Sequence, residues 1–185
     1  MGRHLASARE TIIDAAEDVV IETGARHMTL DAIAARAKVS RGGLLYHFPN
    51  KEALLRAMLE RRVNVHTQSR KDLLASLSEG REREAIALVL SLLKGDEKVK
   101  KVSAALLAAV AHDPRLLMPY RQEFRKIIDE MTEGGLRFER AAAIALAVDG
   151  LMFVEFLGLS PFDKKERGRI IKEIIALAKE EASGP

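Results

Sequence analysis

Apolar residues return every three or four positions along nearly the whole chain, and a glycine, a proline or a capping polar residue interrupts each periodic stretch. The first stretch covers residues 5–23, carries Ile12, Ala16, Val19 and Val20 on one face, and stops at Gly24. The alternation of apolar and polar residues that marks a half-buried strand is not found. This pattern predicts an all-α chain of about nine helices.

The composition is typical of a folded helical protein and also indicates the cellular compartment. Of 185 residues, 48% are hydrophobic, 31% charged and 4% aromatic, which suits helices and disfavours β-rich folds. The lack of cysteine excludes disulfides and thiolate metal sites and fits a reducing cytoplasm. The longest stretch without Asp, Glu, Lys or Arg, Val102 to His112, is too short to span a membrane. We therefore expect a cytoplasmic protein of one or two domains.

Two domains are expected, and the boundary between them falls near Pro49. Residues 1–50 hold three short helices, after which Asn50 caps a long helix that runs towards Leu77. Residues 51–185 form a larger and more apolar helical bundle, with breaks at Gly80, at Gly95-Asp96 and at Gly134-Gly135. Residues 182–185 are expected to fray.

The segment from Thr29 to Phe48 predicts a helix-turn-helix. Thr29 caps a short helix, Lys38-Val39 forms a tight turn, and Ser40 caps a second helix in which Leu44 and Phe48 share one face. Residues 32–51 contain four basic and no acidic side chains, which is either a footprint for phosphates or an ordinary solvated face.

The residue types of the second helix suit contact with DNA. Arg41 heads this helix, and a guanidinium pairs with the O6 and N7 atoms of guanine. Gly42 and Gly43 cost helix stability, which makes sense where the backbone approaches DNA closely. Tyr46 and His47 can bond phosphates, although Tyr46 packing on the first helix and His47 as a plain surface residue are the alternatives.

Residues 9–59 resemble the DNA-binding domain of the tetracycline-repressor (TetR) family of bacterial transcription regulators. The matching residues are Ala15-Ala16, Gly24, Thr29, Ile33-Ala34, Val39-Ser40, Gly42, Tyr46-His47-Phe48, Pro49-Asn50-Lys51-Glu52 and Leu54-Leu55. The rest of the chain is similar in helix number and length. The resemblance implies DNA contacts from eight residues: Thr29, Arg41, Gly42, Gly43, Leu45, Tyr46, His47 and Lys51.

Two positions depart from the family pattern. Lys38 stands where the family usually has a glycine in the turn, at a cost of about 1–2 kcal/mol if the backbone there is left-handed. Leu45 stands where the family usually has a phosphate-binding tyrosine, so the contact is lost, moves to Tyr46, or is replaced by contact with a thymine methyl group.

The family resemblance also places an effector site in the larger bundle. By position it would be lined by residues of the long connecting helix and of the helix after Pro119: Met58, His66, Tyr120, Phe124 and Met131. A plain packed core explains each of these equally well. No Lys or Arg interrupts the stripe of Tyr120, Phe124 and Met131, so an apolar or amphipathic small molecule is expected rather than an anionic one.

The last two helices carry more apolar surface than a lone hairpin can cover, and the resemblance implies a two-fold dimer through a four-helix bundle. Asp149 interrupts an apolar helix and is expected at this interface or facing a ligand, with the interface favoured. The other expected interface residues are Leu151, Val154, Ile171, Ile174, Ile175 and Ala178.

No motif for catalysis, a cofactor or a metal is present. The five histidines never stand three or four positions apart, and no phosphate-binding or nucleophile motif occurs. We therefore expect a homodimeric regulator, a repressor rather than an activator, that binds operator DNA and is released by its effector. The alternative is a helical adaptor that binds protein instead of DNA; a helical enzyme is a distant third.

Overall fold

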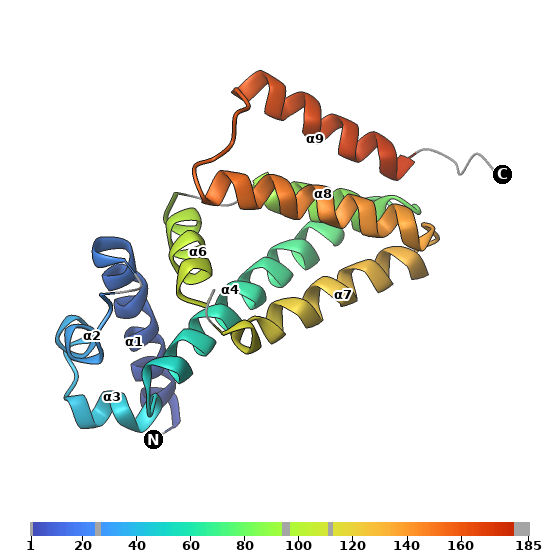
Figure 1. The fold of residues 1–185 in the computed structure, drawn as a ribbon. Helices are drawn as coiled ribbons and strands as arrows, with labels where there is room; N and C mark the ends of the chain where they lie inside the picture. The colour runs from blue at the N-terminus through green and yellow to red at the C-terminus, as the bar shows by residue number, and fades with distance from the viewer. Residues whose placement is uncertain (1, 25–26, 94–96, 111–112, 180–185) are drawn as a thin grey trace. The chain divides into compact units, whose positions relative to one another are not determined.

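The computed structural model describes residues 2–24, 27–93, 97–110 and 113–179, and within these ranges all regular structure is helical. Nine α-helices and one 3-10 helix follow one another (Figure 1): α1 (Gly2–Thr23), α2 (Leu30–Ala37), α3 (Arg41–His47), α4 (Lys51–Leu74), α5 (Arg83–Leu93), α6 (Glu97–Val110), η1 (Pro114–Leu117), α7 (Met118–Glu133), α8 (Phe138–Phe156) and α9 (Lys164–Lys179). The predicted all-α fold is confirmed. None of these helices is both long and apolar enough to cross a membrane.

Two compact units divide the chain, and we call them the head unit and the body unit. The head unit comprises Met1–Arg62 and Glu97–Pro119, and the body unit comprises Val63–Asp96 and Tyr120–Pro185. The helix α4 contributes its first half to the head unit and its second half to the body unit. The head unit is therefore larger than the expected domain of residues 1–50, because it also takes in α6 and η1.

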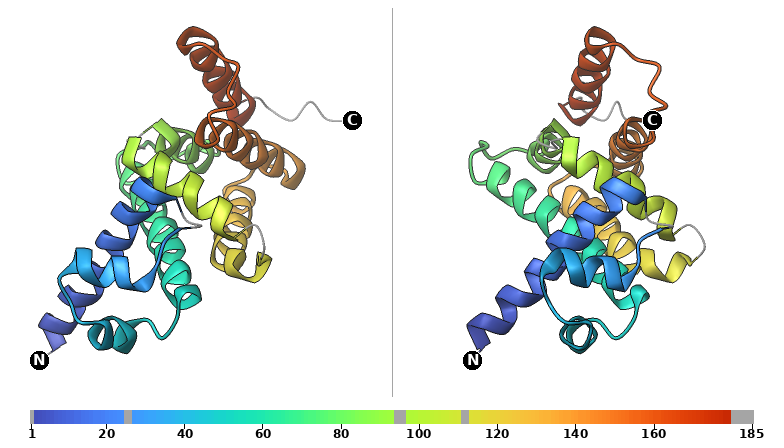
Figure 2. Two further views of the ribbon diagram at one scale, coloured as in Figure 1. Left: turned by 60° about the vertical axis from the view of Figure 1, so that its left-hand side comes forward. Right: turned by 90° about the vertical axis from the view of Figure 1, so that its left-hand side faces the viewer.

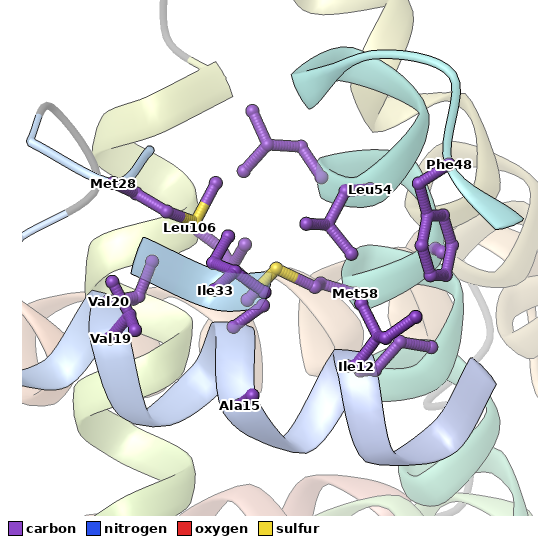
Figure 3. Close-up of a cluster of buried hydrophobic side chains, with 14 of the residues drawn as sticks. Ile12, Ala15, Val19, Val20, Met28, Ile33, Phe48, Leu54, Met58 and Leu106 are labelled. Carbon is purple, nitrogen blue, oxygen red and sulfur yellow. The ribbon is translucent and has the colours of Figure 1, made fainter. Parts of the chain in front are cut away.

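The core of the head unit is built from α1, α2, α3, α4 and α6. Ile12, Ile33, Leu54 and Met58 are fully buried, and Leu106 of α6 reaches the same cluster (Figure 3). Such burial of branched and sulfur-containing side chains is what stabilises a small helical unit. α6 lies against α1 (Figure 2), and the Lys98 ammonium pairs with the Asp18 carboxylate at 2.8 Å.

The predicted caps of the first helices are confirmed. The Thr29 hydroxyl accepts a hydrogen bond from the Ala32 N–H at 3.2 Å, and Ser40 accepts one from the Gly43 N–H at 3.0 Å. Asn50 caps α4 by accepting from the Ala53 N–H at 2.8 Å. Each cap satisfies a backbone donor that the first helical turn cannot pair by itself.

Lys38 adopts the left-handed conformation, with φ 56° and ψ 37°. The N–H of Lys38 bonds the Ala35 carbonyl at 3.2 Å, and the N–H of Val39 bonds the Ala34 carbonyl at 3.0 Å. These two bonds form a Schellman motif, which normally ends in glycine. The turn therefore takes the backbone shape that its lysine disfavours.

The body unit packs α5, α8 and α9 against one another and adds α7. Its buried residues include Leu88, Val89, Ile127, Met131, Ile144, Val148, Ile171 and Ile174. Gly135, with φ +102°, ends α7, as the Gly134-Gly135 pair predicts. The expected break at Gly95-Asp96 and the expected fraying of residues 182–185 lie outside the described residues.

Candidate nucleic-acid interface and effector region

One face of α3, the second helix of the helix-turn-helix, packs against the rest of the head unit. Leu44 is fully buried and Phe48, just beyond the helix, is 3% exposed, and the Arg9 guanidinium lies 5.4 Å from the centre of the Phe48 ring. The opposite side carries Arg41 and Gly42, which are exposed. The helix therefore offers to solvent the side that the sequence assigns to DNA.

The remaining α3 residues named from the sequence also reach the surface. Tyr46 is 74% exposed, so it does not pack on α1, and its ring meets the His47 ring edge-on at 5.2 Å. Gly43, Leu45 and His47 are partly exposed. Leu45 is therefore available for an apolar contact, and Tyr46 is the exposed tyrosine of this helix.

Arg41 forms an ion pair that the sequence did not suggest. Its Nη1 atom lies 2.5 Å from Oδ1 and 2.6 Å from Oδ2 of Asp31, near the start of α2. Both side chains are largely exposed, so water screens the pair and it adds little stability. Asp31 lies on α2 and Arg41 on α3, so no local sequence pattern pointed to this pair.

The helix starts at Thr29 and Lys51 supply the groups that suit phosphate. Because the Thr29 oxygen accepts the capping bond, its hydroxyl proton remains available to donate. Lys51 is the first residue of α4, beside backbone N–H groups at the positive end of the helix. Both positions lie in the head unit.

Gly42 and Gly43 differ in what surrounds them. A Cβ atom added to Gly42 would meet nothing nearer than the Ser40 hydroxyl oxygen at 4.0 Å, whereas one on Gly43 would lie 3.2 Å from that oxygen. The fold of the head therefore gives a reason for glycine at position 43, where the cap is close. It gives none at position 42.

The body unit contains a buried charged cluster, which we call the Arg70 cluster: Arg70, Glu84, Glu123 and Glu130. Arg70 of α4 is 1% exposed, and its guanidinium bonds Glu84 at 2.8 Å and Glu130, with Glu123 at 3.8 Å. Burial, with the charge of Glu130 acting in the same direction, raises the pKa of the Glu84 carboxyl. Lys126 also contacts Glu130 at 3.7 Å, so two basic side chains face the three carboxylates.

His66 lies one turn before Arg70 and bonds Ser91 of α5. The Ser91 hydroxyl donates to the Leu88 carbonyl at 2.7 Å, so its oxygen accepts from Nε2–H of His66 at 2.9 Å. Burial, together with the positive charge of Arg70, lowers the pKa of His66 below its ordinary 6.5. The imidazole is therefore neutral at physiological pH.

Tyr120 and Asp149 join α7 to α8. The Tyr120 hydroxyl donates a hydrogen bond to the Asp149 carboxylate, and the Tyr120 ring stacks on Phe124 with centroids 6.2 Å apart. Burial raises the pKa of both groups, and for Tyr120 the Asp149 charge adds to this effect. Asp149 thus has its hydrogen-bond partner within its own protomer. The sequence instead predicts a partner at the dimer interface or on a ligand.

The five residues expected around an effector belong to two different units. Met58 is fully buried in the core of the head unit, whereas Met131 is fully buried in the core of the body unit. Met58 is therefore explained as a core residue. His66, Tyr120, Phe124 and Met131 all belong to the body unit.

The apolar residues expected at the dimer interface are mostly buried within the single chain. Leu151, Ile171, Ile174 and Ala178 are 7% exposed or less, because α5, α8 and α9 cover them within one protomer. They form part of the core of the body unit. Val154 and Ile175 are partly exposed.

Another side of α8 carries part of the exposed apolar surface of the body unit. Leu146 is 61%, Phe153 50% and Leu157 40% exposed, and Gly150 between them has open space beside its Cα. These four residues are spaced by four, three and four positions, which places them on one side of the helix. We call them the α8 stripe.

Sequence reasoning missed the Arg70 cluster and Ser91. Glu123 and Glu130 stand four and three positions from the buried Ile127, which places their carboxylates on its face and was the signal available. Arg70 and Ser91 carry no comparable signal. Among the described residues, no His, Asp and Glu side chains group as a metal site.

A capped helix-turn-helix whose second helix turns its polar side outwards defines a DNA-binding protein of the helix-turn-helix class. Residues 12–58 match the family described as bacterial regulatory proteins of the tetR family, and residues 52–179 match the tetracyclin repressor-like C-terminal domain. The chain therefore belongs to the TetR family. Its members are transcriptional regulators rather than enzymes.

Individual proteins show the same relationship at low identity. The transcriptional regulator BetI of Paraburkholderia phymatum is 26% identical over 179 residues, which cover 91% of each chain. The crystal structure of a transcriptional regulator from Rhodococcus sp. Rha1 has a TM-score of 0.75 at 22% identity, covering 92% of this chain and 95% of that one. The multidrug binding protein EbrR, solved with imidazole, has a TM-score of 0.71 at 23% identity, covering 95% and 92%. The two solved structures share the fold.

Proposed function

We propose that the protein is a homodimeric repressor that binds operator DNA and leaves it when a small molecule binds. The observation that carries this proposal is the solvent-facing side of α3, where Arg41, Gly42 and Tyr46 stand outwards while Leu44 is fully buried. Residues 1–50 would bind DNA, and residues 51–185 would bind the effector and a second copy. The protein would work in the cytoplasm, where its DNA lies.

On DNA, α3 would enter the major groove. Arg41 would read a guanine, Leu45 would touch a base methyl group, and Tyr46 and His47 would reach phosphates. Gly42 and Gly43 would let the helix backbone come close. Thr29 and Lys51, at the starts of α2 and α4, would bond phosphates on either side, which fixes the register of the helix.

Dimerisation supplies two such helices at a fixed separation. Successive major grooves on one face of DNA lie about 34–36 Å apart, so the two heads must match that distance. The α8 stripe supports a two-fold contact, because a helix face with Leu146 and Phe153 outwards buries apolar area against its copy. Asp149, Val154 and Ile175 would lie at its border.

The effector would bind the body unit and be amphipathic or apolar. The stacked rings of Tyr120 and Phe124 offer apolar contact, and His66 offers a neutral polar group. Arg70 already faces three carboxylates, so it does not supply the free positive charge that a phosphorylated metabolite needs. The name of EbrR, a multidrug binding protein of the same fold, agrees with such a ligand.

Release follows if the effector binds one conformer of the dimer more tightly than another. The favoured conformer would hold the heads at a separation that does not fit DNA. The affinity for DNA would then fall by the ratio of the effector's binding constants for the two conformers. A bound effector would also stabilise the body unit, by about 2.7 kcal/mol at a hundredfold excess over its dissociation constant.

Binding of genomic duplex fragments at 50 and 200 mM salt tests the proposal. A DNA-binding dimer retains selected fragments, and its affinity falls steeply with salt because phosphate contacts release counterions. Compounds that raise the melting temperature should then release the fragment. Failure to retain any fragment at either salt concentration would favour a protein–protein adaptor instead.

A further inference from the structure

Arg41, the residue proposed to contact a base, already forms an ion pair in the free protein. Its Nη1 atom bonds both oxygens of Asp31, at 2.5 and 2.6 Å, across the turn of the helix-turn-helix. Within the part of the chain that the structure describes, Asp31 is the partner of this guanidinium. Both side chains are largely exposed, so a duplex that contacts Arg41 would also meet Asp31.

The atoms that Asp31 leaves free are the ones a guanine needs. A guanidinium has five N–H donors on three nitrogens, and Asp31 engages Nη1 alone. The Nε and Nη2 atoms remain as an adjacent pair of donors, and guanine presents the adjacent acceptors O6 and N7 in the major groove. An arginine fixed at Nη1 can therefore still make the two-pronged contact.

We propose that Asp31 is a positioning residue for Arg41 and thereby determines the base specificity of α3; this inference rests on the proposed function. A long side chain loses rotamer freedom when it binds, and holding it beforehand avoids on the order of a 2- to 10-fold loss of affinity. Asp31 does this at the site where one base pair is read.

The carboxylate also suppresses contacts with the wrong partner. Asp31 neutralises the charge that Arg41 would otherwise offer to any phosphate, and it places a negative charge beside the DNA backbone. Removing it should therefore strengthen binding to unrelated duplexes while it weakens discrimination at the guanine. An ion pair with a purely structural role would leave the discrimination at the guanine unchanged.

Selection from a random-sequence duplex library tests the inference with five proteins: wild type, Asp31→Asn, Asp31→Glu, Arg41→Ala and Glu22→Gln. The last is the matched control, because Glu22 pairs with Arg36 between α1 and α2 at 2.5 Å and is similarly exposed. Affinities are then measured for the selected duplex, for duplexes with each guanine pair replaced, and for an unrelated duplex. Helical circular dichroism confirms that each variant is folded.

The expected result is specific to one base pair. Arg41→Ala should lose the preference for one guanine per half-site, and Asp31→Asn should reduce that same preference about tenfold while binding the unrelated duplex more tightly. Asp31→Glu should restore part of the preference, and Glu22→Gln should behave as wild type. If Asp31→Asn discriminated as well as wild type while Arg41→Ala did not, the inference would be wrong and the proposed function would stand. If the wild type selected no sequence, both would be wrong.

Discussion

At Gly42, the residue type that stabilises the helix differs from the one that we expect DNA binding to require. It lies in the first turn of α3, and a Cβ there would have no protein atom nearer than 4.0 Å. Glycine destabilises a helix relative to alanine, by about 1 kcal/mol, because its backbone loses more entropy. We therefore expect the head to be more stable with alanine, and the fold gives no reason for glycine at this position.

Gly42→Ala is therefore expected to raise the free energy of unfolding by about 1 kcal/mol and to weaken operator binding. Chemical denaturation and DNA titration measure the two effects. Gly168→Ala in α9, where a Cβ also meets nothing within 4 Å, is the control that should gain stability and keep DNA affinity. Unchanged DNA affinity in Gly42→Ala would show that the α3 backbone does not approach DNA.

His66 gives the body unit a pH dependence with a definite sign. Its folded pKa lies below the unfolded value near 6.5, so the unfolded chain binds the proton more readily. Stability from this group is present above pH 6.5 and is lost as the pH falls through that value. Wild type should lose more stability between pH 7.5 and 5.5 than His66→Gln in denaturant titrations. Equal losses in the two proteins would contradict the neutral imidazole.

The sequence predicted the role of a residue where that role depends only on its near neighbours in the chain. Thr29, Ser40 and Asn50 precede helices and cap them, because the capping bond involves residues only three apart. Asp31 was missed because its partner Arg41 lies on another helix. A side chain's partner across two helices depends on their packing, which the local sequence does not encode.

At the scale of elements, α4 carries the charge on which the body unit depends. Arg70 is 1% exposed and stands among Glu84, Glu123 and Glu130 from α5 and α7. Removing one partner of a buried ion pair leaves uncompensated charge, which costs more than the pair itself contributes. The cluster therefore fixes α4 against two other helices.

Arg70→Met is expected to lower the free energy of unfolding by about 3–5 kcal/mol at neutral pH, because three partly buried carboxylates lose the buried guanidinium that they share. Thermal and urea unfolding measure the loss. Arg125→Met removes an exposed pair with Asp129 on α7 and should leave the melting temperature nearly unchanged. Arg70→Met as stable as wild type would show that the carboxylates do not need the guanidinium.

The periodicity of apolar residues predicted where the helices lie. It did not predict which apolar face of a helix is buried within the protomer and which is exposed. The apolar residues of α8 and α9 predicted surplus surface, and the structure buries Leu151, Ile171 and Ile174 within the protomer. Periodicity identifies an apolar face but does not say whether a neighbour in the same chain covers it. α8 is apolar on several sides, so two different faces were candidates for the outer one.

At the scale of the whole molecule, the α8 stripe is where a second copy is expected. Leu146→Glu with Phe153→Glu should convert the dimer to a folded monomer, because two carboxylates then oppose their copies in an apolar contact. Analytical ultracentrifugation measures the mass, and circular dichroism the fold. Ile174→Glu is the contrasting variant and should unfold the body unit, since Ile174 is 4% exposed. A double variant that remained dimeric would place the interface elsewhere.

The most direct test of the central claim, that α3 reads operator DNA, compares two variants on the selected duplex. Arg41→Ala should weaken specific binding by about 1–3 kcal/mol and relax the preference at one guanine per half-site. Lys51→Ala should weaken binding to every sequence alike and reduce the slope of log affinity against log salt by about one. Arg41→Ala that bound the selected duplex with wild-type affinity and preference would contradict the account.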